Sequence, residues 1–198
     1  MIRDSVTRLA ALAFILVAGP ALAAAPTGDP RDLVAANYAA VQTIAMEAPD
    51  QATLTRNMTG AMDVLIDYDA FSQRTLKGTW DTLDEAQRAR FKDLFKRLII
   101  KTYAKRFKPQ TTFTTSFRGD TTWEANRAGA RVASTVTSER VSVDVTYIFK
   151  VSDTPAGPAW RAYDLEVDEV SMALNWRQQF RRVIKRDGFD ALLERIRK

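Results

Sequence analysis

The stretch that decides the fold is VSVDVTYIFKV, residues 141–151. Apolar residues occupy every second position from Val141 to Val151, and this is the period of a β-strand with one apolar face. The same period recurs in residues 113–117, 132–136 and 160–170. Residues with turn composition separate these segments, so neighbouring strands are expected to pair as antiparallel hairpins. The pattern predicts a sheet of about four strands.

Helical signals precede this sheet along the chain. An aspartate followed by proline starts a predicted helix over residues 29–44, and a second, shorter helix is predicted to end near Gly78. Residues 82–109 have apolar side chains at helical spacing and end in a proline. Thr82 and Glu85 are spaced as a capping box at the start of that long helix.

Helical signals also follow the sheet. Ser171 is expected to cap a helix that ends at Gly188, and residues 189–196 predict a final short amphipathic helix. Helices on both sides of an antiparallel sheet predict an α+β fold, in which a twisted sheet packs against N-terminal and C-terminal helices. Such a half-cone can be filled by side chains or enclose an apolar pocket. A single domain is expected over residues 24–198.

The first 23 residues have the pattern of an export signal. Arg3 and Arg8 form a positive region, residues 9–18 are an unbroken apolar run, and Ala21-Leu22-Ala23 matches a signal peptidase site. The apolar run is shorter than the ~20 residues of a membrane-spanning helix. We therefore expect a signal peptide cleaved after Ala23 and a soluble periplasmic protein of a Gram-negative bacterium.

Composition excludes much of catalytic chemistry. The 198 residues include no histidine and no cysteine, which removes the usual general base, the commonest zinc ligand, the thiolate nucleophile and any disulfide. We expect no cofactor, no metal and no enzyme activity. The formal net charge of +5 fits an anionic lipid surface or an acidic partner better than nucleic acid, which an exported protein rarely meets.

An enzyme that uses a Tyr/Asp pair for acid–base chemistry is the alternative. The candidate pairs are Tyr147 with Asp144 and Tyr163 with Asp164. Residues separated by an odd number of positions on a strand point to opposite faces, which argues against both pairs. By the same alternation, Asp164 and its acidic neighbours are expected on a solvated face.

Several segments resemble the MlaC family of periplasmic phospholipid-binding proteins, also called toluene-tolerance auxiliary proteins. They are DYDAFSQRTLKGTW at 67–80, the helix with Gln87, Arg88, Phe91, Leu94, Phe95 and Thr102-Tyr103-Ala104, VSVDVTYIF at 141–149, and WRAYD at 160–164 with Ser171, Asn175, Arg177, Gln179, Phe180 and Gly188-Phe189. The resemblance covers nearly all of the mature chain in the same order. Two positions depart from the family pattern, since Glu169 stands where glycine is common and Trp176 where tyrosine is usual.

The resemblance implies a phospholipid shuttle that maintains the lipid asymmetry of the outer membrane. Such a carrier takes lipid from an outer-membrane lipoprotein complex and delivers it to an inner-membrane ABC transporter with an MCE-domain ring. In such a carrier the acyl tails lie in the pocket and the head group stays near solvent. We expect the protein to be a monomer. Hopanoid-associated relatives make a polycyclic lipid the alternative cargo.

The pattern alone favours a solid core for the apolar stripes, and the resemblance is what makes them candidate pocket residues. The expected lipid-binding residues are Leu94, Phe95, Leu98, Tyr103, Val132, Val136, Val143, Val145, Tyr147, Phe149, Tyr163, Leu165, Val167, Val170 and Leu174. The residues expected to contact a head group or a partner protein are Arg97, Lys101, Arg161 and Arg177.

Overall fold

The computed structural model describes residues 26, 28–138 and 141–197. The predicted signal peptide lies outside the described residues, and its cleavage stays a prediction. None of the described helices combines the length and the apolar character that crossing a membrane requires.

The N-terminal half is helical, and an aspartate caps each of its α-helices. The helices are α1 (Pro30–Glu47), α2 (Gln51–Leu65), α3 (Tyr68–Thr75) and α4 (Glu85–Ala104), with a 3₁₀ turn at Trp80–Thr82. The side chains of Asp29, Asp50, Asp67 and Asp84 each accept a hydrogen bond from a backbone N–H of the first turn. These bonds satisfy donors that the helices leave free, and they fix where each helix begins.

The start and end of α4 differ from the prediction. The capping box is formed by Asp84 and Gln87, whose side chains each accept the other's backbone N–H at 2.8 and 3.0 Å. Thr82 belongs to the preceding 3₁₀ turn, where its hydroxyl donates to the Thr79 carbonyl, so the predicted Thr82–Glu85 box is wrong. The helix ends at Ala104, before Pro109, which leaves residues 105–113 as a connecting segment.

The second half of the chain forms an antiparallel sheet followed by two helices. The strands are β1 (Thr114–Phe117), β2 (Thr122–Trp123), β3 (Gly129–Ser138), β4 (Val141–Thr154), β5 (Gly157–Val167) and β6 (Val170–Ser171). A 3₁₀ turn at Ala125–Arg127 lies between β2 and β3, and α5 (Met172–Asp187) and α6 (Phe189–Arg197) complete the described chain. In the described residues the sheet has six strands in the order β1-β3-β4-β5-β6, with β2 also paired to β3. The predicted α+β class is confirmed, and the strands beyond the expected four are short edge segments.

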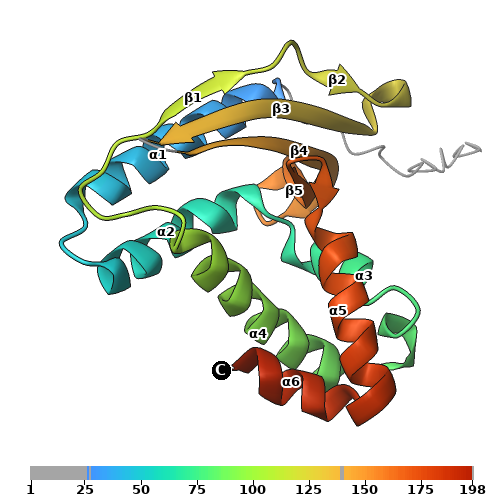
Figure 1. The fold of residues 1–198 in the computed structure, drawn as a ribbon. Coiled ribbons are helices and arrows are strands. Elements are labelled where there is room, and N and C mark those ends of the chain that lie inside the picture. Colours follow the sequence, from blue (N-terminus) through green and yellow to red (C-terminus); the bar gives the residue numbers. More distant parts are fainter. Residues whose placement is uncertain (1–25, 27, 139–140, 198) are drawn as a thin grey trace, which may run out of the picture.

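The helices lie on one side of the curved sheet. Figure 1 shows the sheet at one end of the molecule with α1 alongside it, while α4 and α5 extend away from it. The last helix, α6, contacts both α4 and α5 at their far ends. Part of the interior is solid there, because Phe91, Phe95 and Phe180 pack with ring centroids 5.2 to 5.9 Å apart.

A bulge in β5 changes which of its residues face the helices. Phe149 pairs with Ala162 and Tyr147 pairs with Leu165, so Ala162 and Leu165 share a face although three positions separate them. Tyr163 is the extra residue that this register shift accommodates. Simple alternation along the strand predicts that Tyr163 and Leu165 point to the same face. Because of the bulge, Tyr163 does not share the face of Leu165.

The prediction of a solvated Asp164 is wrong. Its side chain is fully buried, and it accepts hydrogen bonds from Arg74 Nε at 2.8 Å, Ser171 Oγ at 2.6 Å and Ala173 N at 3.0 Å. The carboxylate therefore ties α3 and the N-terminus of α5 to the sheet. Burial is tolerated because the charge is paired and hydrogen-bonded.

Candidate functional site: an apolar cavity beneath the sheet

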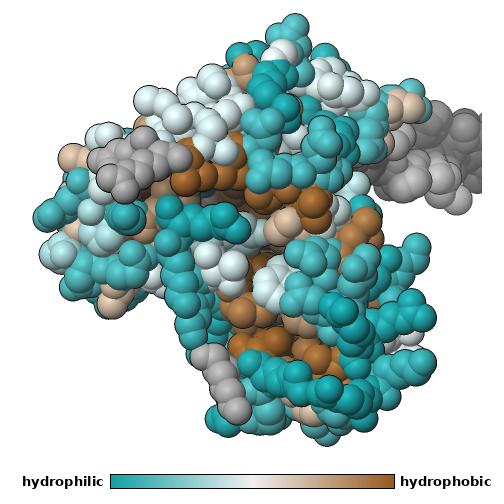
Figure 2. Space-filling model, viewed as in Figure 1, coloured by the Kyte–Doolittle hydropathy of each residue, from teal (hydrophilic) through white to brown (hydrophobic). Residues whose placement is uncertain are grey.

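An apolar cavity of about 570 Å³ lies between the sheet and the N-terminal helices. The lining residues are Asn37, Tyr38, Val41, Met58, Met62, Leu65, Ile66, Tyr103, Arg106, Phe107, Lys108, Thr111, Thr112, Phe113, Val136, Ser138, Val141, Val143, Val145, Tyr147, Leu165 and Val167. Figure 2 shows hydrophobic residues gathered in a hollow below the sheet, with hydrophilic residues around it. This volume is within the roughly 300–1,000 Å³ that small-molecule sites occupy.

Three strands form one wall of the cavity. Val136 pairs with Val143 across β3 and β4, and Val145 pairs with Val167 across β4 and β5. Directly paired residues project from the same face of a sheet, so the registers bring these valines together. The β-branched residues that favour a strand thus also provide its apolar surface.

Helices α1 and α2 form the opposite wall. Met58, Met62 and Leu65 are spaced by four and three positions, which places them on one face of α2. Tyr38 and Val41 come from the inner face of α1 in the same way. The flexible thioether side chains of the two methionines can adapt to ligands of different shape.

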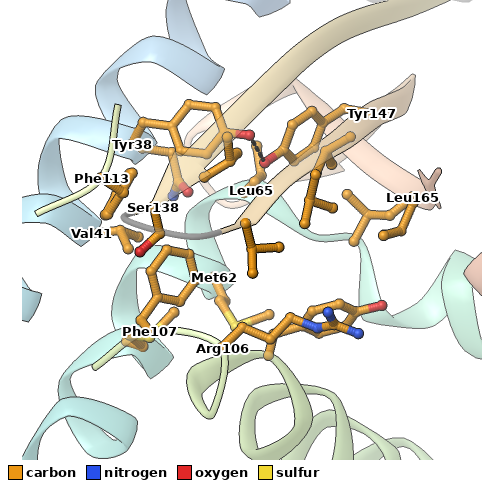
Figure 3. Close-up of a pocket in the computed structure, with 18 of the residues that line it drawn as sticks. Tyr38, Val41, Met62, Leu65, Arg106, Phe107, Phe113, Ser138, Tyr147 and Leu165 are labelled. Atoms are coloured by element: carbon orange, nitrogen blue, oxygen red, sulfur yellow. Dashed lines mark hydrogen bonds between the residues drawn. The ribbon is translucent and has the colours of Figure 1, made fainter. Parts of the chain in front are cut away.

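A chain of hydroxyl groups crosses the interior from the sheet to α1. The Tyr147 hydroxyl donates to the Tyr38 hydroxyl at 2.9 Å, Tyr38 shares a hydrogen bond with Ser134 Oγ at 3.0 Å, and Ser134 donates to the Val145 carbonyl at 3.2 Å. Figure 3 shows the two tyrosine hydroxyls meeting at the edge of the cavity. Burial raises the pKa of Tyr38 and, further, that of Tyr147, so both phenols stay neutral at physiological pH.

The opening of the cavity includes the segment after α4. Arg106 and Lys108 are exposed and contribute to the lining together with Phe107. Figure 3 shows Arg106 extended along the cavity below Met62. Burial raises the pKa of the nearby Tyr103 to about 12, and the positive charge of Arg106 partly offsets that rise.

The structure brings part of the predicted lipid-binding set together around this cavity. The predicted residues that line it are Tyr103, Val136, Val143, Val145, Tyr147, Leu165 and Val167. Leu94, Phe95, Leu98, Val132 and Phe149 belong instead to the packed core. Tyr163 and Leu174 line a shallow second pocket, and Val170 is half exposed on β6. For every residue of the set, lipid contact itself stays a prediction.

The cations predicted to contact a head group or partner lie away from the cavity lining. Arg97 is exposed and pairs with Asp93 at 2.9 Å, and Lys101 is exposed on the same helix. Arg161 donates to the Asp63 carbonyl from β5. Arg177 donates to the Arg74 carbonyl at 3.0 Å and lines the second pocket. A docking role for these four residues remains a prediction.

Neither Tyr/Asp pair forms a catalytic arrangement around the cavity. Asp144 lies on the face of β4 opposite Val143 and Val145, where it pairs with Arg118 at 2.8 Å, whereas Tyr147 faces the cavity. Asp164 is occupied by Arg74, Ser171 and Ala173. In the described part of the chain, no group of three acidic side chains is placed to hold a metal ion.

The sequence prediction missed the contribution of α1, α2 and the segment after α4. The 4-4-3 spacing of Leu54, Met58, Met62 and Leu65 was a usable signal, because it marks one apolar face of a helix. Arg106 carried no such signal. Arg106 lies within the stretch predicted as one helix up to Pro109, but the structure ends α4 at Ala104 and places Arg106 in the cavity lining.

The fold and the cavity define an α+β protein with an internal apolar pocket between a curved sheet and helices. The family model described as MlaC protein matches residues 34–198, and the chain therefore belongs to the MlaC family. This confirms the resemblance drawn from the sequence motifs.

A solved structure has the same fold. It is described as the phospholipid-binding protein from Ralstonia solanacearum in complex with a phospholipid. The two chains are 21% identical, and the match has a TM-score of 0.74 and covers 85% of this chain and 95% of the other. A comparison with curated proteins finds no match.

Proposed function

We propose that this protein is a periplasmic phospholipid carrier that holds acyl chains in the cavity beneath its sheet. The observation that carries the proposal is an open cavity of about 570 Å³ whose lining is mainly Val, Leu, Met and aromatic side chains. Membership of the MlaC family and the phospholipid described in the Ralstonia solanacearum structure support it.

The energetics of lipid transfer require a pocket of this kind. Moving one methylene from an apolar phase into water costs about 0.8 kcal/mol, so a sixteen-carbon chain needs roughly 12 kcal/mol of compensation. Paired valines on the sheet and methionines on α2 offer apolar contact without polar groups that would have to be desolvated. The hydroxyl groups of Tyr38 and Tyr147 do not oppose this role because they hydrogen-bond to each other.

The transport route that we propose follows from the family. The carrier would receive lipid from an outer-membrane lipoprotein complex and pass it to an inner-membrane ABC transporter with an MCE-domain ring. Its direction would be set by those partners and their energy input, since a carrier only equilibrates with both. In this scheme the signal peptide delivers the chain to the periplasm and the protein has no catalytic step.

Lipid analysis of the purified protein tests the proposal. The full chain would be expressed with its own N-terminus in a Gram-negative host, purified from the periplasm without detergent, and measured by native mass spectrometry. We expect a mass increment that organic extraction identifies as phospholipid. A protein that carries no lipid, and that takes none from phospholipid vesicles, would refute the carrier function; a polycyclic lipid would redirect it to hopanoid transport.

A further inference from the structure

Among the described residues that line the cavity, the charged side chains are all positive. Arg106 and Lys108 line its opening, and the other lining residues that the structure describes are uncharged. The ion pairs among described residues include neither of these cations. Lys92 and Lys96 of α4 differ in this respect, because they pair with Asp69 and Asp63 at 2.5 and 2.7 Å.

Backbone hydrogen bonds fix the segment that carries these cations. The Arg106 N–H donates to the Tyr103 carbonyl at 2.9 Å, and the Gln110 N–H donates to the Ala45 carbonyl of α1 at 2.7 Å. Further along, the Phe113 N–H donates to Gln42 Oε1 at 3.0 Å. The segment is thus tied to α1 on one side and to the end of α4 on the other, which holds Arg106 at the boundary between the apolar wall and solvent.

A guanidinium group at that boundary suits a phosphate. Arginine presents several N–H donors in a planar fork that matches phosphate oxygens, and it remains charged at any physiological pH. A ligand whose tails fill the cavity would leave its polar end at the opening, beside Arg106. A head group that also carries an ammonium would bring a positive charge toward Arg106 and Lys108, with no carboxylate among the described lining residues to receive it.

We propose that Arg106, assisted by Lys108, binds the phosphate of the cargo and makes the carrier prefer lipids whose head group has a net negative charge. The proposal rests on the proposed carrier function and adds head-group selectivity to it. Because Arg106 is exposed, the preference is modest, and an exposed ion pair corresponds to a change of up to about fivefold in a binding ratio.

A competition between two lipids in the same vesicle measures this preference. The delipidated full-length protein would be incubated with vesicles of equal parts phosphatidylglycerol and phosphatidylethanolamine with identical acyl chains, and native mass spectrometry would give the ratio of bound lipids. We expect phosphatidylglycerol to be favoured by up to about fivefold, and by less at high salt because screening weakens exposed charges.

Three variants connect the ratio to Arg106. Arg106→Gln should bring the ratio of bound lipids close to one. Arg106→Lys keeps the charge and should retain part of the preference. Lys105→Gln is the matched control, because Lys105 is the exposed neighbour at the C-cap of α4 and does not line the cavity, and it should keep the wild-type ratio.

Each outcome decides a separate question. Wild-type protein that binds neither lipid would refute the carrier function itself. Lipid binding with a ratio near one, or an Arg106→Gln ratio equal to that of the wild type, would overturn the selectivity while the carrier function stands. Glycerol 3-phosphate, tested as a soluble competitor, distinguishes the source of the phosphate: tight binding of this compound without any lipid uptake would overturn the lipid assignment.

Discussion

Replacing Val143 by tryptophan places a large side chain in the proposed acyl pocket. Val143 pairs with Val136 across β3 and β4, and both residues line the cavity. If the indole group displaces about four methylenes of a bound chain, the loss at about 0.8 kcal/mol each is about 3 kcal/mol. This corresponds to roughly a 150-fold weaker partition of lipid into the protein.

Uptake of a fluorescent phospholipid from vesicles measures this effect, with thermal unfolding recorded on the same samples. Ser142→Trp is the control, because Ser142 is exposed on the opposite face of the same strand and bonds Thr137 Oγ1 at 2.6 Å. We expect Ser142→Trp to take up lipid as the wild type does. If Val143→Trp keeps both its Tm and its lipid uptake, the acyl chains bind elsewhere and the reasoning fails. Should Val143→Trp not fold, Val143→Phe tests the same point with less volume.

The remaining predictions concern stability and pH. Asp164→Asn should lower the free energy of unfolding by about 3 kcal/mol, because it removes the charged partner of Arg74 at a buried site; an unchanged denaturation midpoint would show that the pair contributes nothing. Glu169→Gly should raise it by about 1 kcal/mol, since Glu169 has a φ of 67° in the turn between β5 and β6; equal or lower stability in urea unfolding would contradict this. Stability should fall above about pH 10, because burial raises the folded-state pKa of Tyr147 and the unfolded chain therefore loses its phenolic protons first. Tyr147→Phe should reduce that alkaline loss, and a pH profile identical to the wild type would refute the assignment.

The sheet could be predicted because its pattern is local. Alternation in residues 141–151 identified β4 and its inward face, including Val143, Val145 and Tyr147, and the structure places all three at the cavity. The face to which each of these side chains points depends only on the two-residue period of a strand. The same rule failed at Tyr163, because the register of β5 shifts there by one residue and the apolar residues on either side of Tyr163 give no sign of it. This bulge depends on how β5 pairs with β4, which a pattern within β5 does not contain.

The cavity itself could not be derived from the sequence pattern. An apolar stripe has the same appearance whether it closes on a partner or faces an empty space, and Phe95 and Val143 were equivalent candidates for that reason. Phe95 packs against Phe91 and Phe180 in the solid core, whereas Val143 faces the hollow. The difference arises from where α1 and α2 stand relative to the sheet, which is a property of the tertiary structure.

Hydrogen bonds between the elements around the cavity explain how its walls can remain apart. Side-chain packing stabilises by filling space, but a hydrogen bond holds two elements at a fixed distance without occupying the volume between them. Asn37 Nδ2 donates to the Ala61 carbonyl at 2.7 Å and joins α1 to α2, and Gln51 Nε2 donates to the Ala104 carbonyl at 2.9 Å and joins α2 to α4. The tyrosine pair joins α1 to β4 in the same manner. Loss of one of these hydrogen bonds should therefore change the shape of the pocket, and with it lipid uptake. The stability of the fold should change less, because the aromatic core lies between α4 and α5.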